Sequence, residues 1–152
     1  MTIHTAGGYA MMVAAANAAT EAAAQECCPR PLIVGVTILT SLDEADLTSI
    51  GYQDSLPNQV LKMAKLAKKS GLDGVVCSPH EIKLIRDTCG PDFKLVVPGI
   101  RPGGNRKGDQ KRVMTPKEAI NLGADFLVIG RPITQADDPV AAVRAIVEEI
   151  NS

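Results

Sequence analysis

The stretch Lys94-Leu-Val-Val-Pro-Gly-Ile100 decides the fold. Its apolar, β-rich residues are typical of a strand that is covered on both faces, and the Pro and Gly within it mark where the strand gives way to a loop. Similar runs occur at residues 2–5, 32–39, 74–78 and 126–130. The sequence therefore predicts five buried strands.

Helical patterns separate these strands. The first helix is expected at residues 9–28, because Pro29 cannot continue it. A short helix follows Thr40, with Ser41 as its N-cap and acidic residues near its positive end. Further helices are expected at residues 57–71, 79–88, 116–122 and 139–150. Strands that alternate with helices indicate an α/β fold with a parallel sheet.

The composition fits one compact domain. The chain has 152 residues, of which 45% are hydrophobic and 22% charged, with 16 Lys and Arg against 17 Asp and Glu. This balance argues against disorder and against a protein that binds nucleic acid. Residues 10–24 are too short and too polar to span a bilayer, so no membrane partner is expected. The four cysteines lack the spacing of a metal site and are interpreted as reduced thiols of a cytoplasmic protein.

Units of about 30 residues can build either an open doubly wound sheet or a (β/α)8 barrel of the TIM-barrel family. The strongest polar signals follow the last two strands, where barrel enzymes hold phosphate, and no Gly-x-Gly-x-x-Gly turn follows any strand. These features favour the barrel. Five βα units do not close a barrel, so residues 1–152 are expected to be the C-terminal part of a single barrel domain, with about three units missing upstream.

Two loops with glycine and arginine form the predicted phosphate site. Arg101 follows the fourth strand, and Gly130 and Arg131 follow the fifth. Glycine lets backbone N–H groups approach a ligand closely, and the guanidinium fork matches phosphate oxygens. The alternative is that each arginine pairs with a carboxylate on a neighbouring helix. The polar stretch 102–115 has the composition of a lid over a charged ligand, or of a disordered surface loop.

Hydroxyl groups follow the second strand. Thr40 is the stronger ligand candidate there, and Ser41 is the secondary one because its favoured role is the helix cap. His4, near the end of the first strand, is interpreted as a structural residue rather than a base.

At these positions the sequence resembles the bacterial orotidine 5′-monophosphate decarboxylase family. Six motifs, in order along the whole chain, make the resemblance far more specific than any one of them. They are Thr2-Ile-His-Thr-Ala-Gly-Gly8, Gly35-Val-Thr-Ile-Leu-Thr-Ser41, Leu72-Asp-Gly-Val-Val-Cys-Ser78, Val97-Pro-Gly-Ile-Arg-Pro102, Gly108-Asp-Gln-Lys-Arg-Val-Met-Thr-Pro116 and Ile129-Gly-Arg-Pro-Ile-Thr134.

The resemblance implies a homodimeric barrel that converts orotidine 5′-monophosphate to uridine 5′-monophosphate in de novo pyrimidine synthesis, without metal or organic cofactor. Matched by motif, the expected contacts to phosphate are Arg101, Gln110, Arg131 and the backbone of Gly130. Thr40, with Ser41 as the secondary candidate, is expected at the pyrimidine end. Binding energy at the distant phosphate can help to organise the reacting end.

The reacting residues of the family are not in this chain. They lie in an Asp-x-Lys-x-x-Asp motif, with an additional lysine from another strand, and neither Asp92-Phe-Lys94 nor Asp109-Gln-Lys111 continues as that motif requires. We therefore expect no catalytic residue here and no activity from this chain alone. Two alternatives stay open: a sugar-phosphate aldolase or epimerase of the same barrel superfamily, and a non-catalytic half-barrel that binds phosphate or nucleotide with a complementary chain.

Overall fold

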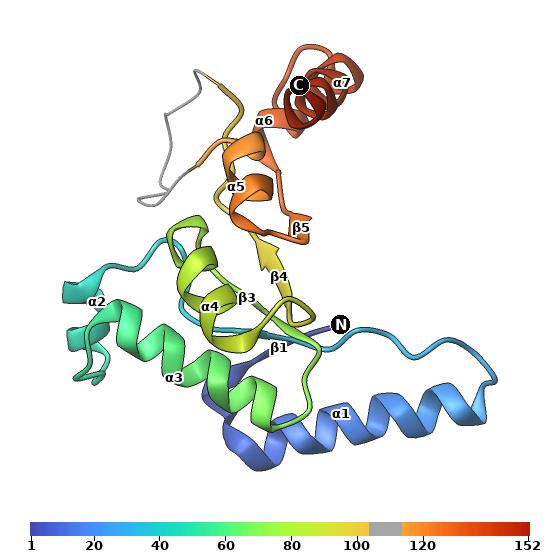
Figure 1. Cartoon of the computed structure of the whole chain (residues 1–152), viewed down its shortest axis with the longest axis vertical. Helices are drawn as coiled ribbons and strands as arrows, with labels where there is room; N and C mark the ends of the chain where they lie inside the picture. The colour runs from blue at the N-terminus through green and yellow to red at the C-terminus, as the bar shows by residue number, and fades with distance from the viewer. Residues whose placement is uncertain (104–113) are drawn as a thin grey trace.

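The computed structural model describes residues 1–103 and 114–152 and contains one sheet of five parallel strands. The sheet order follows the chain, β1-β2-β3-β4-β5, so each strand pairs with its predecessor (Figure 1). The strands are β1 Thr2–His4, β2 Val34–Val36, β3 Gly74–Val76, β4 Lys94–Val97 and β5 Phe126–Leu127. This arrangement confirms the expected α/β fold with five βα units.

The helices fill the connections between strands. The predicted positions are confirmed, with ends shifted by a few residues. Two short elements, η1 at Thr5–Gly7 and α6 at Arg131–Thr134, were not predicted. The elements are η1 Thr5–Gly7, α1 Gly8–Gln25, α2 Glu44–Ser49, α3 Leu56–Lys69, η2 Pro79–Glu81, α4 Ile82–Cys89, α5 Pro116–Leu122, α6 Arg131–Thr134 and α7 Pro139–Asn151. Within residues 1–103 and 114–152, none of these helices combines the length and apolarity needed to cross a membrane.

The core lies between the sheet and helices α1, α3 and α4. Met12 of α1, Val60 of α3 and Ile85 of α4 are fully buried. They share one apolar cluster with Val75 of β3 and Leu95 of β4. The middle of the sheet is therefore the most firmly packed part of the chain.

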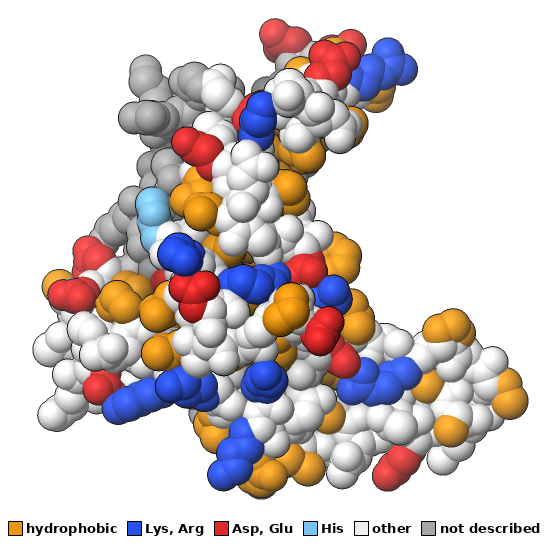
Figure 2. All heavy atoms as spheres, viewed as in Figure 1, with side chains coloured by type: hydrophobic (Ala, Val, Ile, Leu, Met, Phe, Trp, Pro, Cys, Tyr) orange, Lys and Arg blue, Asp and Glu red, His pale blue; other side chains and the backbone are white. Residues whose placement is uncertain are grey.

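The prediction that all five strands are buried was wrong for the two outer strands. Thr2 and His4 of β1 are exposed, and the side chains of Phe126 in β5 and Val128 just beyond it are 48% and 49% exposed. In the described ranges 1–103 and 114–152, each outer strand has a neighbouring strand on one side only, so the sheet is open at both edges. The space-filling view in Figure 2 shows a wide hollow between the two ends of the molecule, which are α7 at the top and α1 at the bottom in Figure 1.

Ser41 is not the N-cap of α2, contrary to expectation. That position belongs to Asp43, whose Oδ1 accepts a hydrogen bond from the Asp46 N–H at 3.0 Å, while the Asp43 N–H donates to Asp46 Oδ2 at 3.0 Å. A carboxylate at this position satisfies an orphan N–H and also complements the positive helix end. Ser41 lies in the loop before the helix, where it is half-buried.

Gly74 of β3 lies against the backbone of β4 and leaves no room for a side chain. A Cβ atom added to Gly74 would collide with the backbone carbonyl of Lys94, which cannot move without breaking the sheet. Glycine is therefore required here for close backbone approach rather than for a turn.

An ion pair fixes the amino end of β3 against β2. Arg30 Nη1 donates to both carboxylate oxygens of Asp73 at 2.8 Å, and the Ile33 N–H donates to Asp73 Oδ2 at 2.7 Å. The Asp73 N–H in turn donates to the Ile33 carbonyl at 2.9 Å. One aspartate thus joins the start of its own strand to the strand beside it.

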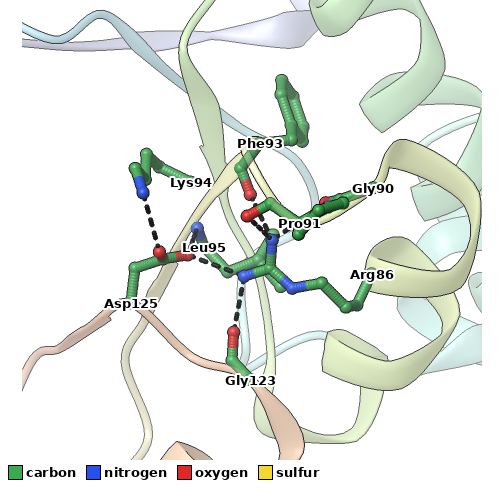
Figure 3. Close-up of polar contacts among 8 residues, drawn as sticks. All are labelled: Arg86, Gly90, Pro91, Phe93, Lys94, Leu95, Gly123 and Asp125. Carbon is green, nitrogen blue, oxygen red and sulfur yellow. Dashed lines mark hydrogen bonds and ion pairs between the residues drawn. The ribbon is translucent and has the colours of Figure 1, made fainter.

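The same arrangement recurs at the amino end of β5 (Figure 3). Asp125 Oδ2 accepts hydrogen bonds from Arg86 Nη2 at 2.7 Å and from the Leu95 N–H at 2.9 Å, and its Oδ1 accepts one from Lys94 at 3.1 Å. Arg86 also donates to the carbonyls of Gly90, Pro91, Phe93 and Gly123. We call Arg30–Asp73 and Arg86–Asp125 the amino-edge clamps.

The second clamp changes the acidity of its aspartate. Burial by itself would raise the pKa of Asp125, but the Leu95 N–H, Arg86 and Lys94 stabilise the carboxylate more strongly. The pKa of Asp125 is therefore lowered from its ordinary value. Asp125 is therefore ionised at neutral pH, and its hydrogen bonds link the amino ends of β4 and β5.

Candidate functional site

The carboxyl ends of the five strands lie at one edge of the sheet, opposite the amino-edge clamps. Two buried threonine hydroxyls join adjacent strand ends there. Thr5 Oγ1 donates to the Val36 carbonyl at 2.8 Å, and Thr37 Oγ1 donates to the Val76 carbonyl at 3.0 Å. Neither role was predicted, although a threonine directly after an apolar strand is a usable signal. These bonds hold the base of the site in place.

Thr40 and Ser41 line a cavity of about 250 Å³ at this edge. Thr40 is buried and Ser41 half-buried, so both side chains stand in the wall rather than at the outer surface. The full lining is Val36, Ile38, Leu39, Thr40, Ser41, Val76, Cys77 and Pro98. A mostly apolar wall with a few hydroxyl groups suits the flat face of a small polar ring. Sequence reasoning missed Cys77, whose place directly after β3 was the available signal.

Arg101 is held by a short bridge beyond β4. Gly99 has φ +79°, a left-handed conformation that glycine adopts at little cost and that turns the chain toward Ile100. Ile100 forms a parallel bridge with Met114, and the Arg101 N–H donates to the Met114 carbonyl at 2.9 Å. Arg101 Nη1 donates to the Ile100 carbonyl at 2.8 Å, and the residue is half-buried. Its guanidinium therefore lies close to the turn and retains further N–H donors.

Gly130 and Arg131 stand at the exposed end of the β5 unit. Gly130 immediately precedes α6, and its carbonyl accepts hydrogen bonds from the N–H groups of Ile133 and Thr134 at 2.9 and 3.0 Å. A Cβ atom added to Gly130 would meet open space, so no internal packing requires glycine at this position. Both Gly130 and Arg131 are exposed. The backbone at Gly130 is thus open to approach from outside.

The sheet brings the predicted residues to the same edge but not into one cavity. Arg101 and Arg131 follow neighbouring strands, β4 and β5, as the phosphate prediction requires. Neither arginine lines the cavity that contains Thr40 and Ser41. Gln110, and most of the stretch expected to cover the ligand, lie outside the described residues. His4 is exposed at the end of β1.

The arrangement places two kinds of side chain in different parts of this edge. Hydroxyl groups and apolar side chains line the cavity beyond β2 and β3, and the two arginines follow β4 and β5. A ligand with a polar ring at one end and an anionic group at the other matches this division. No cluster of three or more His, Cys, Asp or Glu side chains that would hold a metal ion occurs in the described part of the chain.

Parallel βα units that alternate along the chain, with polar side chains gathered at the carboxyl edge of the sheet, are the arrangement of (β/α)8-barrel proteins. The chain belongs to the orotidine 5′-phosphate decarboxylase / HUMPS family, whose model matches residues 1–146. It is 56% identical to the orotidine 5′-phosphate decarboxylase of Moorella thermoacetica over 99% of its length, and 51% identical to that of Glaesserella parasuis over 97%. The names of these relatives favour the decarboxylase interpretation over the aldolase or epimerase.

Solved structures agree with this assignment. The crystal structure of orotidine 5′-phosphate decarboxylase from Lactobacillus acidophilus superposes with a TM-score of 0.82 at 38% identity, covering 99% of this chain and 62% of that one. The enzyme from Pyrococcus horikoshii, at 24% identity and a TM-score of 0.58, shares the fold. The chain spans 60% and 63% of the lengths of the Moorella and Glaesserella relatives.

Proposed function

We propose that this chain supplies the substrate-holding part of an orotidine 5′-monophosphate decarboxylase, which forms uridine 5′-monophosphate in pyrimidine synthesis. The observation that carries the proposal is 56% identity to a protein of that name along 99% of this chain. The complete enzyme is expected to be a cytoplasmic homodimer that uses no metal or organic cofactor, as the family resemblance implies. The substrate has a pyrimidine ring at one end and a phosphate at the other, which matches the two kinds of contact at the carboxyl edge.

The proposed roles divide along that edge. Thr40, with Ser41 as the secondary candidate, contacts the pyrimidine end from the cavity wall. Arg101 and Arg131 bind the phosphate through charge-assisted hydrogen bonds, and the open backbone at Gly130 adds an uncharged contact. Gln110 belongs to the same phosphate set by its motif. Phosphate binding remote from the reacting bond lowers the barrier when its energy holds the pyrimidine in the reactive position.

Bond breaking is proposed to need groups from outside this chain. Loss of carbon dioxide leaves a carbanion that a lysine must protonate, and the family's Asp-x-Lys-x-x-Asp motif is absent from this sequence. Residues that hold the substrate without that lysine bind the nucleotide but do not turn it over. The second candidate function is therefore a non-catalytic half-barrel that needs a complementary chain. The open edges of the sheet and the exposed side chains of Phe126 and Val128 favour it.

A complementation assay tests the proposal. The complement is the portion of the Moorella thermoacetica relative that this chain does not match, expressed as a separate polypeptide. Conversion of orotidine 5′-monophosphate, followed as loss of ultraviolet absorbance, is measured for this chain, for the complement and for an equimolar mixture of the two, which we call the complemented assembly.

We expect turnover from the complemented assembly only. Turnover by the isolated chain would show that catalytic groups lie within it and would refute the proposed division of roles. A complemented assembly that folds and binds uridine 5′-monophosphate but leaves the substrate unchanged would support the binding half-barrel instead.

A further inference from the structure

Two adjacent cysteines, Cys27 and Cys28, lie in the turn that follows α1, and no step of the proposed function uses them. Both are exposed, whereas the other two cysteines of the chain, Cys77 and Cys89, are buried. Figure 1 shows this turn at the far end of α1, away from the sheet. Reagents in solution therefore reach Cys27 and Cys28 without passing through the core or the candidate site.

The backbone presents the pair in a defined conformation. The Cys28 N–H donates to the Ala23 carbonyl at 3.0 Å, and the Cys27 N–H donates to the Ala24 carbonyl at 3.4 Å. These two bonds form a Schellman motif, in which the helix ends at a residue in the left-handed conformation. Cys27 occupies that position with φ +50°. Both thiols are thus attached to a fixed turn rather than to a loose chain.

The spacing of the two residues disfavours a direct disulfide. Adjacent Cα atoms are about 3.8 Å apart across a trans peptide bond, whereas disulfides usually join Cα atoms about 4.4–6.8 Å apart. A direct disulfide between adjacent cysteines would therefore be strained. A bridge in which one larger atom lies between the two sulfurs closes a wider ring than the disulfide does and reduces that strain. Thiolates are soft ligands and select soft, thiol-binding centres over oxygen-binding cations.

We propose that Cys27 and Cys28 form a two-thiol site that captures a soft trivalent centre, of the chemical class of organic arsenic(III) compounds. With phenylarsine oxide, both S–H bonds and the arsenic–oxygen double bond break, and two arsenic–sulfur bonds form. The two protons leave with the oxygen as one water molecule. Arsenic stays trivalent, so the reaction needs neither an oxidant nor a reductant.

The buried cysteines provide the internal comparison. Cys77 lies in the cavity wall beyond β3, and Cys89 ends α4. Burial raises the pKa of the Cys89 thiol, against the lowering effect of Lys68, Lys65 and Arg86. A thiol that is both buried and harder to ionise reacts more slowly. Selective labelling at the exposed pair is therefore expected.

The test uses this chain within the complemented assembly, treated with phenylarsine oxide. An excess of a monothiol is added to remove arsenic that is held by one sulfur only. Intact mass is expected to show one arsenical per chain. Peptide mapping is expected to place it on the peptide with Cys27 and Cys28, with both thiols protected from maleimide. A dithiol should remove it. In Cys28→Ser, retention should fall roughly 100-fold, because the second, linked ligand is lost.

Cys89→Ala is the matched control, because it removes a thiol and leaves the pair intact, and it should retain the arsenical fully. Equal retention by Cys28→Ser and the unsubstituted chain would overturn the proposal. So would mapping of the arsenical to Cys77 or Cys89. Peptide mapping of the unsubstituted chain decides the matter even when a variant does not fold.

Discussion

Arg131 tests the phosphate assignment at the scale of a single side chain. Its guanidinium is exposed at the carboxyl edge, so replacing it should alter ligand binding without disturbing the core. Arg131→Ala should weaken binding of uridine 5′-monophosphate by the complemented assembly on the order of 10- to 100-fold, the worth of one charge-assisted hydrogen bond. Isothermal titration calorimetry measures this change.

Arg144 offers a matched control for that measurement. It is an exposed arginine on α7 with no proposed ligand role. Arg144→Ala removes the same charge and should leave the dissociation constant within about twofold, since an exposed charge that does not contact the ligand is largely screened by salt. Equal weakening by both variants would mean that net charge, and not a phosphate contact, governs binding.

Asp125 should make the stability of the fold depend on pH. Its pKa is lower in the folded chain than the unfolded value of about 3.9, so its contribution is complete at higher pH. It is lost as the pH falls below about 4 through the folded pKa. Asp125→Asn should cost on the order of 2 kcal/mol at pH 7, because its charged hydrogen bonds to Arg86 and Lys94 are lost. Urea unfolding of the complemented assembly at pH 7 and pH 3 should show the difference shrinking at the lower pH.

The exposed pair Lys83–Asp87 is the control for Asp125. These side chains are 74% and 63% exposed and lie one helical turn apart on α4. Asp87→Asn should change the free energy of unfolding by no more than about 0.5 kcal/mol. If Asp87→Asn lowered the free energy of unfolding as much as Asp125→Asn does, the contribution of Asp125 would not depend on its position in the amino-edge clamp.

At the scale of elements, the end of α1 carries conformational strain that one substitution should remove. Cys27 has φ +50° at the position of the Schellman motif where glycine is usual. Cys27→Gly should therefore raise the free energy of unfolding of the complemented assembly by about 1 kcal/mol. Cys27→Ala, which keeps a Cβ atom, should give no such gain. Equal effects of the two variants in urea unfolding would indicate a cause other than the left-handed conformation.

The contact between β3 and β4 should tolerate no side chain at Gly74. Gly74→Ala places a methyl group against the Lys94 carbonyl and should cost about 1–3 kcal/mol by forcing the strands apart. Gly103→Ala, where the added atom meets open space, should be close to neutral. Thermal unfolding of both variants in the complemented assembly measures the contrast. A neutral Gly74→Ala would mean that the two strands can separate freely.

Local sequence signals predicted the elements well where a single residue determines the outcome. Pro116 and Gly123 bound α5, and Pro139 begins α7, because proline suits the first helical turn and glycine suits a left-handed end. The cap of α2 was wrong, because Ser41 and Asp43 are both good N-caps and the sequence alone does not say where the helix begins. The four residues of α6 were missed, since Arg-Pro-Ile-Thr lacks the length for a periodic pattern.

Strand length and burial were harder to predict than strand position. The apolar run at residues 32–39 contains a paired strand of only three residues, Val34–Val36, although Thr37 and Ile38 beyond it are also buried. An apolar run in the sequence predicts which residues are buried. It does not predict how many of them form hydrogen bonds to a neighbouring strand, because that depends on the length and position of the neighbour. Phe126 likewise has the apolar side chain of a core residue but is exposed. It lies in an outer strand, where burial depends on whether another part of the protein packs against that strand. The residues of the candidate site could be predicted because they directly follow strands. The cavity that includes Cys77 could not be predicted, because its wall is formed by residues at the ends of three different strands.

At the scale of the whole molecule, the open sheet should limit the stability of the isolated chain. In the part of the chain that the structure describes, the two outer strands each have one edge without a partner strand. One face of α7 exposes Val140, Val143 and Val147. We expect the dilute monomer to show no cooperative thermal transition and the complemented assembly to show one, both followed by calorimetry. A sharp transition from the dilute monomer would mean that the five units suffice for a stable fold.

The two amino-edge clamps have a consequence for how such a protein can change over evolutionary time. Each clamp ties a strand to the neighbouring strand using residues from only a few adjacent segments, and both lie at the edge opposite the ligand groups. Substitutions at the carboxyl edge therefore leave strand register intact. New ligand specificity can therefore arise at one edge while the other preserves the architecture. Because each clamp joins two βα units, a unit that is duplicated or exchanged keeps its place only if both partners of its clamp are retained.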